Sequence, residues 1–181
     1  LQRLIKLYLD AGAWDDAVEL LRSEIEEASP QDDPARYARM NLELARVERE
    51  QLGDLGHAAR HLQAAIKADP ESVEAMRSFG ELYLDSGKAT KEGSHKAAII
   101  LLKAAQLAHR RKNEEEALRL ARRCLALRPD DMQAGRLLET ILQSREEWVD
   151  LEELYAQQLA YQQGPRAEGV LLKRAELLET K

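Results

Sequence analysis

The chain has 181 residues, of which 27 are Lys or Arg and 33 are Asp or Glu, so its formal net charge is −6. This acidic balance argues against nucleic acid as the main partner, because phosphate binding needs a surplus of basic residues. Nine Gly and five Pro are too few for the many turns of an all-β fold, while 44% apolar residues are enough to bury a core.

Neither a membrane span nor a signal peptide is found in the sequence. The longest apolar run, residues 97–102, ends at Lys103 and is far shorter than the ~18 residues that a membrane helix needs, so we expect no membrane insertion. Cytoplasm is therefore taken only as the default location. The single Cys124 cannot form an internal disulfide. The chain begins without Met, inside a helical pattern, so we expect it to be a piece of a longer protein.

Apolar residues recur at intervals of three and four between the prolines, which is the period of an α-helix. Proline lacks an amide donor and therefore separates helices here rather than interrupting them. The pattern predicts helices near 1–11, 14–28, 35–52, 55–68, 72–86, 94–111, 114–127, 131–144, 147–163 and 165–180. Because most connections are short, consecutive helices should pack as antiparallel hairpins. The predicted fold class is all-α.

Three segments recur along the chain: 7–12 matches 82–87, 64–70 matches 123–129, and 14–21 matches 148–155. Their displacements are 75, 59 and 134 residues, and the first two add up to the third. This indicates a superrepeat of four helices with copies at 1–70, 71–130 and 131–181, the last incomplete. The second copy is 16 residues short, about one helix and its turn. We expect that one helix is absent after Gly87, that residues 88–93 form a loop in its place, and that the helix packing is irregular near 88–94.

The half-repeats resemble the tetratricopeptide repeat (TPR), a helix-turn-helix unit. The matching residues are Leu4, Tyr8, Gly12, Trp14, Ala17, Leu21 and Pro30 in the first unit, Leu44, Gly53, Ala58, Leu62 and Pro70 in the second, Phe79, Gly80, Tyr83 and Gly87 in the third, Ala105, Ala108, Ala117, Ala121 and Pro129 in the fourth, and Trp148 and Tyr155 in the fifth. The fifth departs from the pattern at Glu146, where Gly is usual, and at Leu151, where Ala is usual.

The resemblance implies a single right-handed superhelical solenoid over 1–181, with about ten helices whose stacked pairs share one continuous core. Small Ala17, Ala58 and Ala117 would let paired helices approach closely. Four bulky aromatic residues would fill the gaps between helices. They are Trp14, Tyr83, Trp148 and Tyr155.

No candidate catalytic, cofactor or metal site is predicted. His57 and His61 have the spacing of a metal-binding pair, but they flank the apolar positions Ala58 and Leu62 and are expected to point to solvent. Cys124 stands where the repeat needs a small buried residue, so it is interpreted as a core residue. We therefore expect a protein without enzymatic activity.

In the TPR family the first helix of each pair lines a concave groove that holds ligands. The resemblance places eight partner-binding residues there: Lys6, Arg39, Arg46, Arg77, Gln106, Arg110, Arg136 and Lys173, in a row completed by Gln2, Glu81 and Thr140. Seven of these eleven are basic, which predicts attraction for an acidic peptide. The alternative is that the arginines form solvated pairs with Glu43, Glu50, Glu74 and Glu139 on neighbouring turns.

The sequence thus predicts a non-catalytic scaffold that binds a protein or peptide segment in the groove. One alternative is a structural module that forms homo-oligomers through its terminal helices 1–11 and 165–180, where leucines such as Leu171, Leu172 and Leu178 are expected to be exposed. A second alternative is the sensor or regulatory arm of a larger regulator or enzyme.

Overall fold

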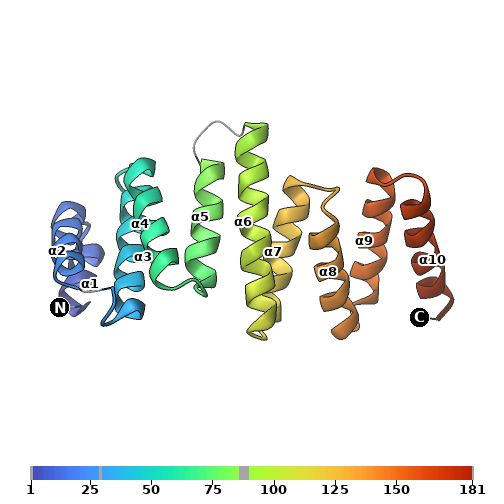
Figure 1. Cartoon of the computed structure of the whole chain (residues 1–181), viewed down its shortest axis with the longest axis horizontal. Coiled ribbons are helices and arrows are strands. Elements are labelled where there is room, and N and C mark those ends of the chain that lie inside the picture. The colour runs from blue at the N-terminus through green and yellow to red at the C-terminus, as the bar shows by residue number, and fades with distance from the viewer. Residues whose placement is uncertain (1, 29, 86–89, 181) are drawn as a thin grey trace. The chain divides into compact units, whose positions relative to one another are not determined.

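The computed structural model describes residues 2–28, 30–85 and 90–180, and every regular element within these ranges is an α-helix (Figure 1). The chain divides into two compact units, unit 1 over residues 1–88 and unit 2 over residues 89–181. The boundary lies inside the predicted second superrepeat. The predicted superrepeat bounds and the right-handed sense of the superhelix are properties of the whole chain and stay predictions.

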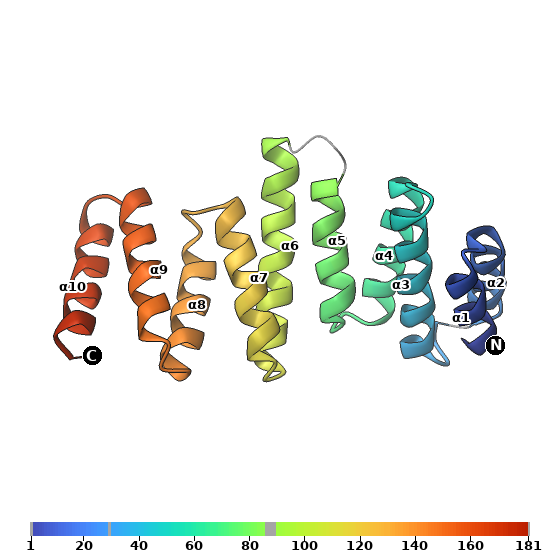
Figure 2. The same cartoon turned by 180° about the vertical axis from the view of Figure 1, so that it is seen from behind.

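Helices joined by short turns make up both units, and Figures 1 and 2 show the alternation of their directions most clearly for α8, α9 and α10. Unit 1 contains α1 (Gln2–Ala11), α2 (Trp14–Glu27), α3 (Pro34–Glu50), α4 (Leu55–Ala68) and α5 (Val73–Asp85). Unit 2 contains α6 (Lys91–Arg110), α7 (Glu114–Leu127), α8 (Met132–Ser144), α9 (Trp148–Tyr161) and α10 (Pro165–Thr180). The all-α prediction is confirmed, and every helix except α6 begins and ends within two residues of its predicted bounds.

Side-chain caps explain where six of the helices begin. A side-chain oxygen just before each helix accepts a hydrogen bond of 2.9–3.2 Å from a backbone N–H in the first turn. Such a bond satisfies a donor that has no partner within the helix. The capping residues are Asp33, Asp54, Ser72, Thr90, Asn113 and Asp131.

The start of α6 differs from the prediction. The Thr90 hydroxyl caps the helix at the N–H of Gly93, 3.0 Å away, and Glu92 pairs with Lys96 one turn later at 2.7 Å. Residues 91–93 are therefore helical, and the loop predicted for them is wrong, because a cap and an ion pair offset the low helix propensity of one glycine. The place predicted for the missing helix falls on residues 86–89, which lie outside the described residues.

Small side chains let neighbouring helices approach each other. Ala17 in α2, Ala58 in α4 and Ala117 in α7 occupy the same position of the second helix in each pair, and none has exposed surface. In unit 2, Cys124 joins this set and is also fully buried, packed with Ala98, Leu102 and Ala134. The predicted close contact between paired helices is therefore present in both units.

Of the four aromatic residues expected to fill gaps, Tyr155 is fully buried, and Trp14, Tyr83 and Trp148 are half-buried. Trp14 packs against an apolar cluster that joins α1, α2 and α3. Phe79 meets Tyr83 edge to face, with ring centroids 5.4 Å apart. The aromatic residues therefore cover the edges of the core as well as filling it.

The turn between the two helices of a pair has the same backbone conformation at four places. Gly12, Gly53, Lys112 and Glu146 each stand two residues before the second helix and have φ of 72°, 66°, 61° and 56°. This left-handed conformation suits glycine, whereas an L side chain there costs about 1–2 kcal/mol. Unit 2 therefore carries two strained turns where unit 1 uses glycine.

A buried polar cluster connects α2, α3 and α4. Glu48 is 1% exposed, its Oε1 accepts a hydrogen bond of 2.9 Å from Arg22, and the Nε2 of His61 lies 3.8 Å from the same oxygen. The other ring nitrogen of His61 is 2.8 Å from Oδ1 of Asn41, which is 1% exposed. The solvent-facing position predicted for His61 is thus wrong, because α3 places two polar partners against this face of α4.

We expect Lys112→Gly and Glu146→Gly each to raise the free energy of unfolding of unit 2 by about 0.5–1 kcal/mol, because glycine removes the cost of the left-handed turn. Urea titration of the full chain measures the effect. The matched control is Arg123→Gly in the middle of α7, which should lower the stability by about 1 kcal/mol. A loss of stability in both turn variants would contradict the assignment of strain.

Burial holds the pKa of His61 below its ordinary value of 6.5, although the carboxylate of Glu48 acts in the opposite direction. In the unfolded chain the ring regains its ordinary pKa and binds a proton more readily. The free energy of unfolding of unit 1 should therefore decrease as the pH falls below about 6.5. Denaturant titrations at a series of pH values should show a shallower loss for His61→Gln.

The control for this experiment is His95→Gln, which removes an exposed histidine of α6 outside the cluster. It should keep the pH dependence of the wild-type chain. Identical slopes for wild type and His61→Gln would show that His61 does not link folding of unit 1 to proton binding.

Candidate functional site

The eight residues predicted to bind a partner all lie on the first helices of the pairs. In unit 1 they are Lys6 on α1, Arg39 and Arg46 on α3, and Arg77 on α5; in unit 2 they are Gln106 and Arg110 on α6, Arg136 on α8, and Lys173 on α10. Each unit thus holds its own half of the set, and one groove running through all eight remains a prediction. The side chain of Gln2 lies outside the described part of the chain.

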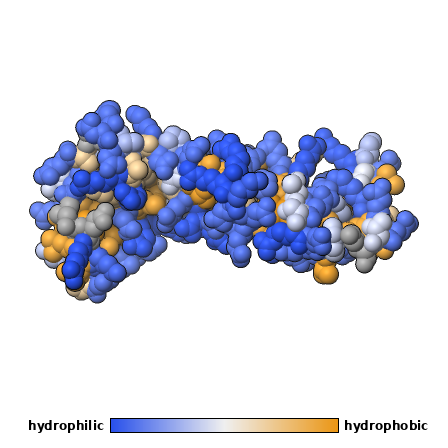
Figure 3. All heavy atoms as spheres, turned by 90° about the horizontal axis from the view of Figure 1, so that it is seen from below, coloured by the Kyte–Doolittle hydropathy of each residue, from blue (hydrophilic) through white to orange (hydrophobic). Residues whose placement is uncertain are grey.

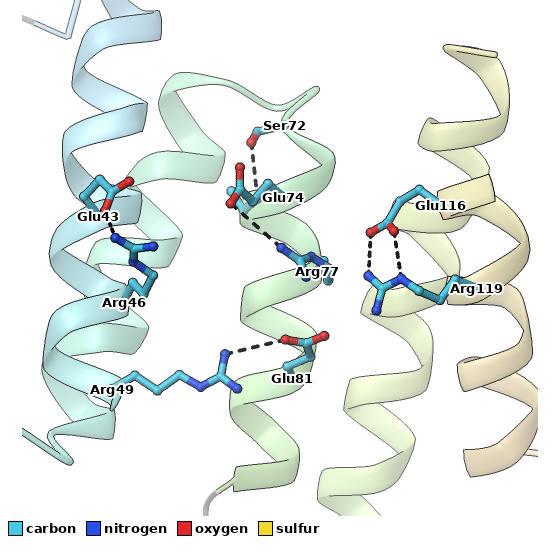
Figure 4. Close-up of polar contacts among 10 residues, drawn as sticks. Glu43, Arg46, Arg49, Ser72, Glu74, Arg77, Glu81, Glu116 and Arg119 are labelled. Carbon is cyan, nitrogen blue, oxygen red and sulfur yellow. Dashed lines mark hydrogen bonds and ion pairs between the residues drawn. The ribbon is translucent and has the colours of Figure 1, made fainter. Parts of the chain in front are cut away.

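Three of the predicted basic residues have acidic partners. Arg46 and Arg77 pair with glutamates three residues earlier on their own helices, Glu43 at 2.7 Å and Glu74 at 3.8 Å (Figure 4). Lys173 instead pairs across helices with Glu139 of α8 at 2.6 Å. The alternative interpretation of solvated pairs therefore holds for Arg46 and Arg77.

The other predicted basic residues are available to a ligand. Lys6, Arg39, Arg110 and Arg136 are exposed, and none has an acidic partner among the described residues.

In unit 1, the first helices α3 and α5 are linked by Arg49, a residue that the prediction omitted. Its guanidinium reaches from α3 to α5, where it lies 3.6 Å from Glu81 (Figure 4). It also lies 2.5 Å from Asp85. Its partners lie more than 30 residues away along the chain, so no local pattern signals it.

In unit 2 the first helices enclose a cleft between α6 and the start of α8, with a volume of about 530 Å³. Ile99, Leu102, Lys103 and Gln106 line it from α6 at helical spacing, and residues 128–133 close the other side. Gln106 was predicted for the site, whereas Lys103 was not. Lys103 lies between Ile99 and Gln106 on the same helix face, a signal that periodicity could have provided.

A second cleft of about 220 Å³ lies between α8 and α10. Arg136 and Glu139 line it from α8, and Arg166, Val170 and Lys173 line it from α10. The structure therefore brings the predicted Arg136 and Lys173 together and adds Arg166. The two clefts share Met132, which is 38% exposed, so they adjoin each other along α8.

The two clefts, called the first-helix clefts from here on, combine an apolar floor with a basic rim. Ile99, Leu102, Met132 and Val170 provide the apolar side chains. Of the five basic residues, Arg128 and Lys173 have acidic partners, Asp131 at 3.1 Å and Glu139 at 2.6 Å. The remaining Lys103, Arg136 and Arg166 have none among the described residues, so the free charge of the rim is mostly positive.

Asp130 and Asp131 at the α6–α8 cleft and Glu139 at the α8–α10 cleft limit this charge. Glu139 is 13% exposed in its side chain, and its Oε1 accepts hydrogen bonds from the Tyr155 hydroxyl at 2.9 Å and from Lys173 at 2.6 Å. Burial and the neighbouring carboxylate raise the pKa of Tyr155, so its hydroxyl remains a donor. Lys173 is therefore held at the edge of the cleft by an internal partner.

Nothing in the described residues assembles a reactive centre around the histidines or the cysteine. Burial raises the pKa of the Cys124 thiol to about 12, and its sulfur lies 3.4 Å from the carbonyl oxygen of Ala98. His57 contacts its capping residue Asp54 at 2.6 Å, while His61 turns toward α3, so the two rings have separate partners. No group of three potential metal ligands occurs among the described residues.

The surface drawn in Figure 3 is mostly hydrophilic, with hydrophobic residues in small separate patches. The large apolar side chains with the most exposure include Leu7, Val149, Tyr161, Leu172 and Leu178. Within the described ranges, no helix combines the length and the hydropathy that crossing a bilayer requires.

No family model and no curated protein matches the sequence. Among solved structures, MamA is 14% identical, with 95% of this chain and 96% of that chain covered and a TM-score of 0.40. A TPR protein from Parabacteroides merdae is 16% identical over 97% of this chain and 70% of its own, with a TM-score of 0.44. The assembly chaperone of RpL4, Acl4, is 15% identical over 88% and 73%, with a TM-score of 0.41. These identities and TM-scores are low, and the helix pairs and repeated turns of this chain themselves make up its TPR-like arrangement.

Proposed function

We propose that this chain is a non-catalytic scaffold whose first-helix clefts bind an acidic segment of a protein partner. The observation that supports this is the set of three basic residues without acidic partners, Lys103, Arg136 and Arg166, around apolar side chains of two adjoining clefts. The floor would bury apolar side chains of the segment, and the basic rim would orient its carboxylates through charge-assisted hydrogen bonds.

A protein segment fits these clefts better than a small metabolite does. They are open and elongated along α8, whereas small-molecule sites enclose most of their ligand. Five ammonium and guanidinium groups stand against three carboxylates at the rim, and the clefts hold no Cys, His or Ser that could act as a nucleophile or base at neutral pH. The binding energy would therefore come from many contacts distributed along an extended surface, as in other repeat proteins.

Self-association through the terminal helices is the second candidate. Leu4 and Leu7 on α1 are 42% and 58% exposed, and Leu171, Leu172 and Leu178 on α10 are 52–66% exposed. Exposed leucines on outer helices favour contact with another copy. A mass that rises with concentration in light scattering, together with loss of that rise on Leu172→Lys, would favour this candidate over the monomeric scaffold.

The scaffold proposal is tested with a designed amphipathic peptide of leucine and glutamate and with its leucine–lysine twin. The full chain should bind the glutamate peptide, and Arg136→Glu/Arg166→Glu should weaken that binding at least tenfold, because each reversal removes a charge-assisted contact. Fluorescence anisotropy at low and high salt measures it, and salt should weaken the wild-type complex.

Arg123→Glu is the matched control, because Arg123 is an exposed basic residue of the same unit outside the clefts. It should bind the glutamate peptide like the wild type. If wild type does not bind this peptide, or if the double variant binds it equally well, the first-helix clefts are not the binding surface.

Glu139→Gln should increase affinity for the glutamate peptide about threefold to tenfold. The variant removes the negative charge from the α8–α10 cleft and releases Lys173 to the ligand, while the glutamine oxygen can still accept from Tyr155. The same anisotropy assay measures the change, with circular dichroism to verify folding. Unchanged or weaker binding by a folded variant would contradict the role of the cleft.

A further inference from the structure

A separate hollow of about 570 Å³ opens between the second helices α7 and α9. Its floor is made of buried leucines, Leu138 and Leu142 from α8 and Leu154 from α9. Leu125 and Ala126 of α7 form one wall. This second-helix hollow shares Gln158 with the α8–α10 cleft but none of the three free basic residues of the first-helix clefts, so its charge differs from theirs.

The floor of the hollow is apolar because one repeat position holds a leucine in unit 2 and a glutamate in unit 1. The carbonyl of Leu142 accepts a hydrogen bond from the N–H of Glu147, the residue just before α9, and the carbonyl of Glu48 accepts the corresponding bond from Asp54, just before α4, across a turn that is one residue longer. Leu142 and Glu48 therefore occupy equivalent positions. In unit 1, the buried Glu48 pairs with Arg22 and faces His61, so polar groups meet at that place. In unit 2 the leucine leaves an apolar floor.

The arginine of the same repeat position behaves accordingly. Arg22 and Arg122 each stand five residues after the small alanine of their helix, Ala17 or Ala117. With Leu142 where α3 has Glu48, Arg122 pairs instead with Asp150 of α9. The pair spans the rim of the hollow and leaves its floor open.

The rim of the second-helix hollow carries negative charge. α9 contains three acidic residues and no basic residue. Asp150 pairs with Arg122 and Glu152 pairs with Arg174, whereas Glu153 interacts only with the side-chain amide of Gln157, at 3.1 Å, among the described residues. Glu153 therefore presents a carboxylate without a cation next to an apolar floor.

An aromatic side chain marks the other end of the hollow. Tyr161 lines it and is 59% exposed, and no hydrogen bond holds its hydroxyl among the described residues. It stands eight residues after Glu153 on the same helix, a separation of about 12 Å. Tyrosine at the edge of an apolar hollow is a side chain that commonly dominates binding energy.

We propose that the second-helix hollow is a docking site for a protein segment that combines bulky apolar residues with Lys or Arg. Its apolar side chains would lie on Leu138, Leu142 and Leu154, and its basic residue would pair with Glu153, with Tyr161 covering the apolar contact. The argument is one of charge complementarity with the rim of α9 and does not rest on the acidic segment proposed for the first-helix clefts.

The test uses the full chain and the leucine–lysine peptide described above. Wild type should bind this peptide, and methyl resonances of the leucines in the floor should shift on binding. Glu153→Lys and Tyr161→Ala should each weaken binding at least tenfold. Matched controls are Glu115→Lys, an exposed acid of α7 outside the hollow, and Leu172→Ala, an exposed apolar residue of α10; both should bind like wild type.

The two binding proposals can be tested independently, because each predicts variants that affect only one of the two peptides. Glu153→Lys and Tyr161→Ala should leave binding of the leucine–glutamate peptide intact, and Arg136→Glu/Arg166→Glu should leave binding of the leucine–lysine peptide intact or strengthen it. No binding of the lysine peptide by wild type, equal binding by folded Glu153→Lys and Tyr161→Ala, or a loss shared by the Glu115→Lys control would overturn the proposed docking site.

Discussion

The close approach of neighbouring helices at small, fully buried side chains is the constraint on which both units depend. Alanines in α2, α4 and α7 have no exposed surface, and Cys124 serves the same purpose in α7. Larger side chains there would separate the helices and expose the leucines that pack around them. Because each helix is held along one narrow face, its opposite face stays exposed and free to carry charge. The candidate binding surfaces lie on those exposed faces.

One core position makes the two units differ in their surfaces. Glu48 in unit 1 needs partners because a buried carboxylate is costly without them, and Arg22 supplies one. Leu142 at the equivalent position of unit 2 needs none, so Arg122 moves to the rim and an apolar hollow remains. This change of polarity in the core accompanies the change from a polar junction to a surface that can receive apolar side chains.

The first helices of unit 2 present free positive charge although the chain as a whole is acidic. Many acidic residues are used elsewhere: they cap helices, stand in first turns such as residues 114–116, or line α9. The helix dipole stabilises acidic residues placed near helix N-termini, because it attracts negative charge there. It leaves α6, α8 and α10 with more basic than acidic groups at their clefts, so the net charge of the chain is a poor guide to the charge of each surface.

The sequence by itself determined the helices, because proline positions, capping residues and apolar periodicity act within a few residues of chain. The sequence also showed glycine at positions 12 and 53 of the repeat and its replacement at Glu146, while the left-handed conformation of these turns comes from the structure. Only the tertiary structure decided which side chains meet: His61 turned inward to Asn41, Lys173 paired with Glu139, and Lys103 and Arg166 joined the clefts. The reason is geometric. One residue of register turns a side chain by about 100° around its helix, and its partner stands on another helix whose placement no local pattern contains.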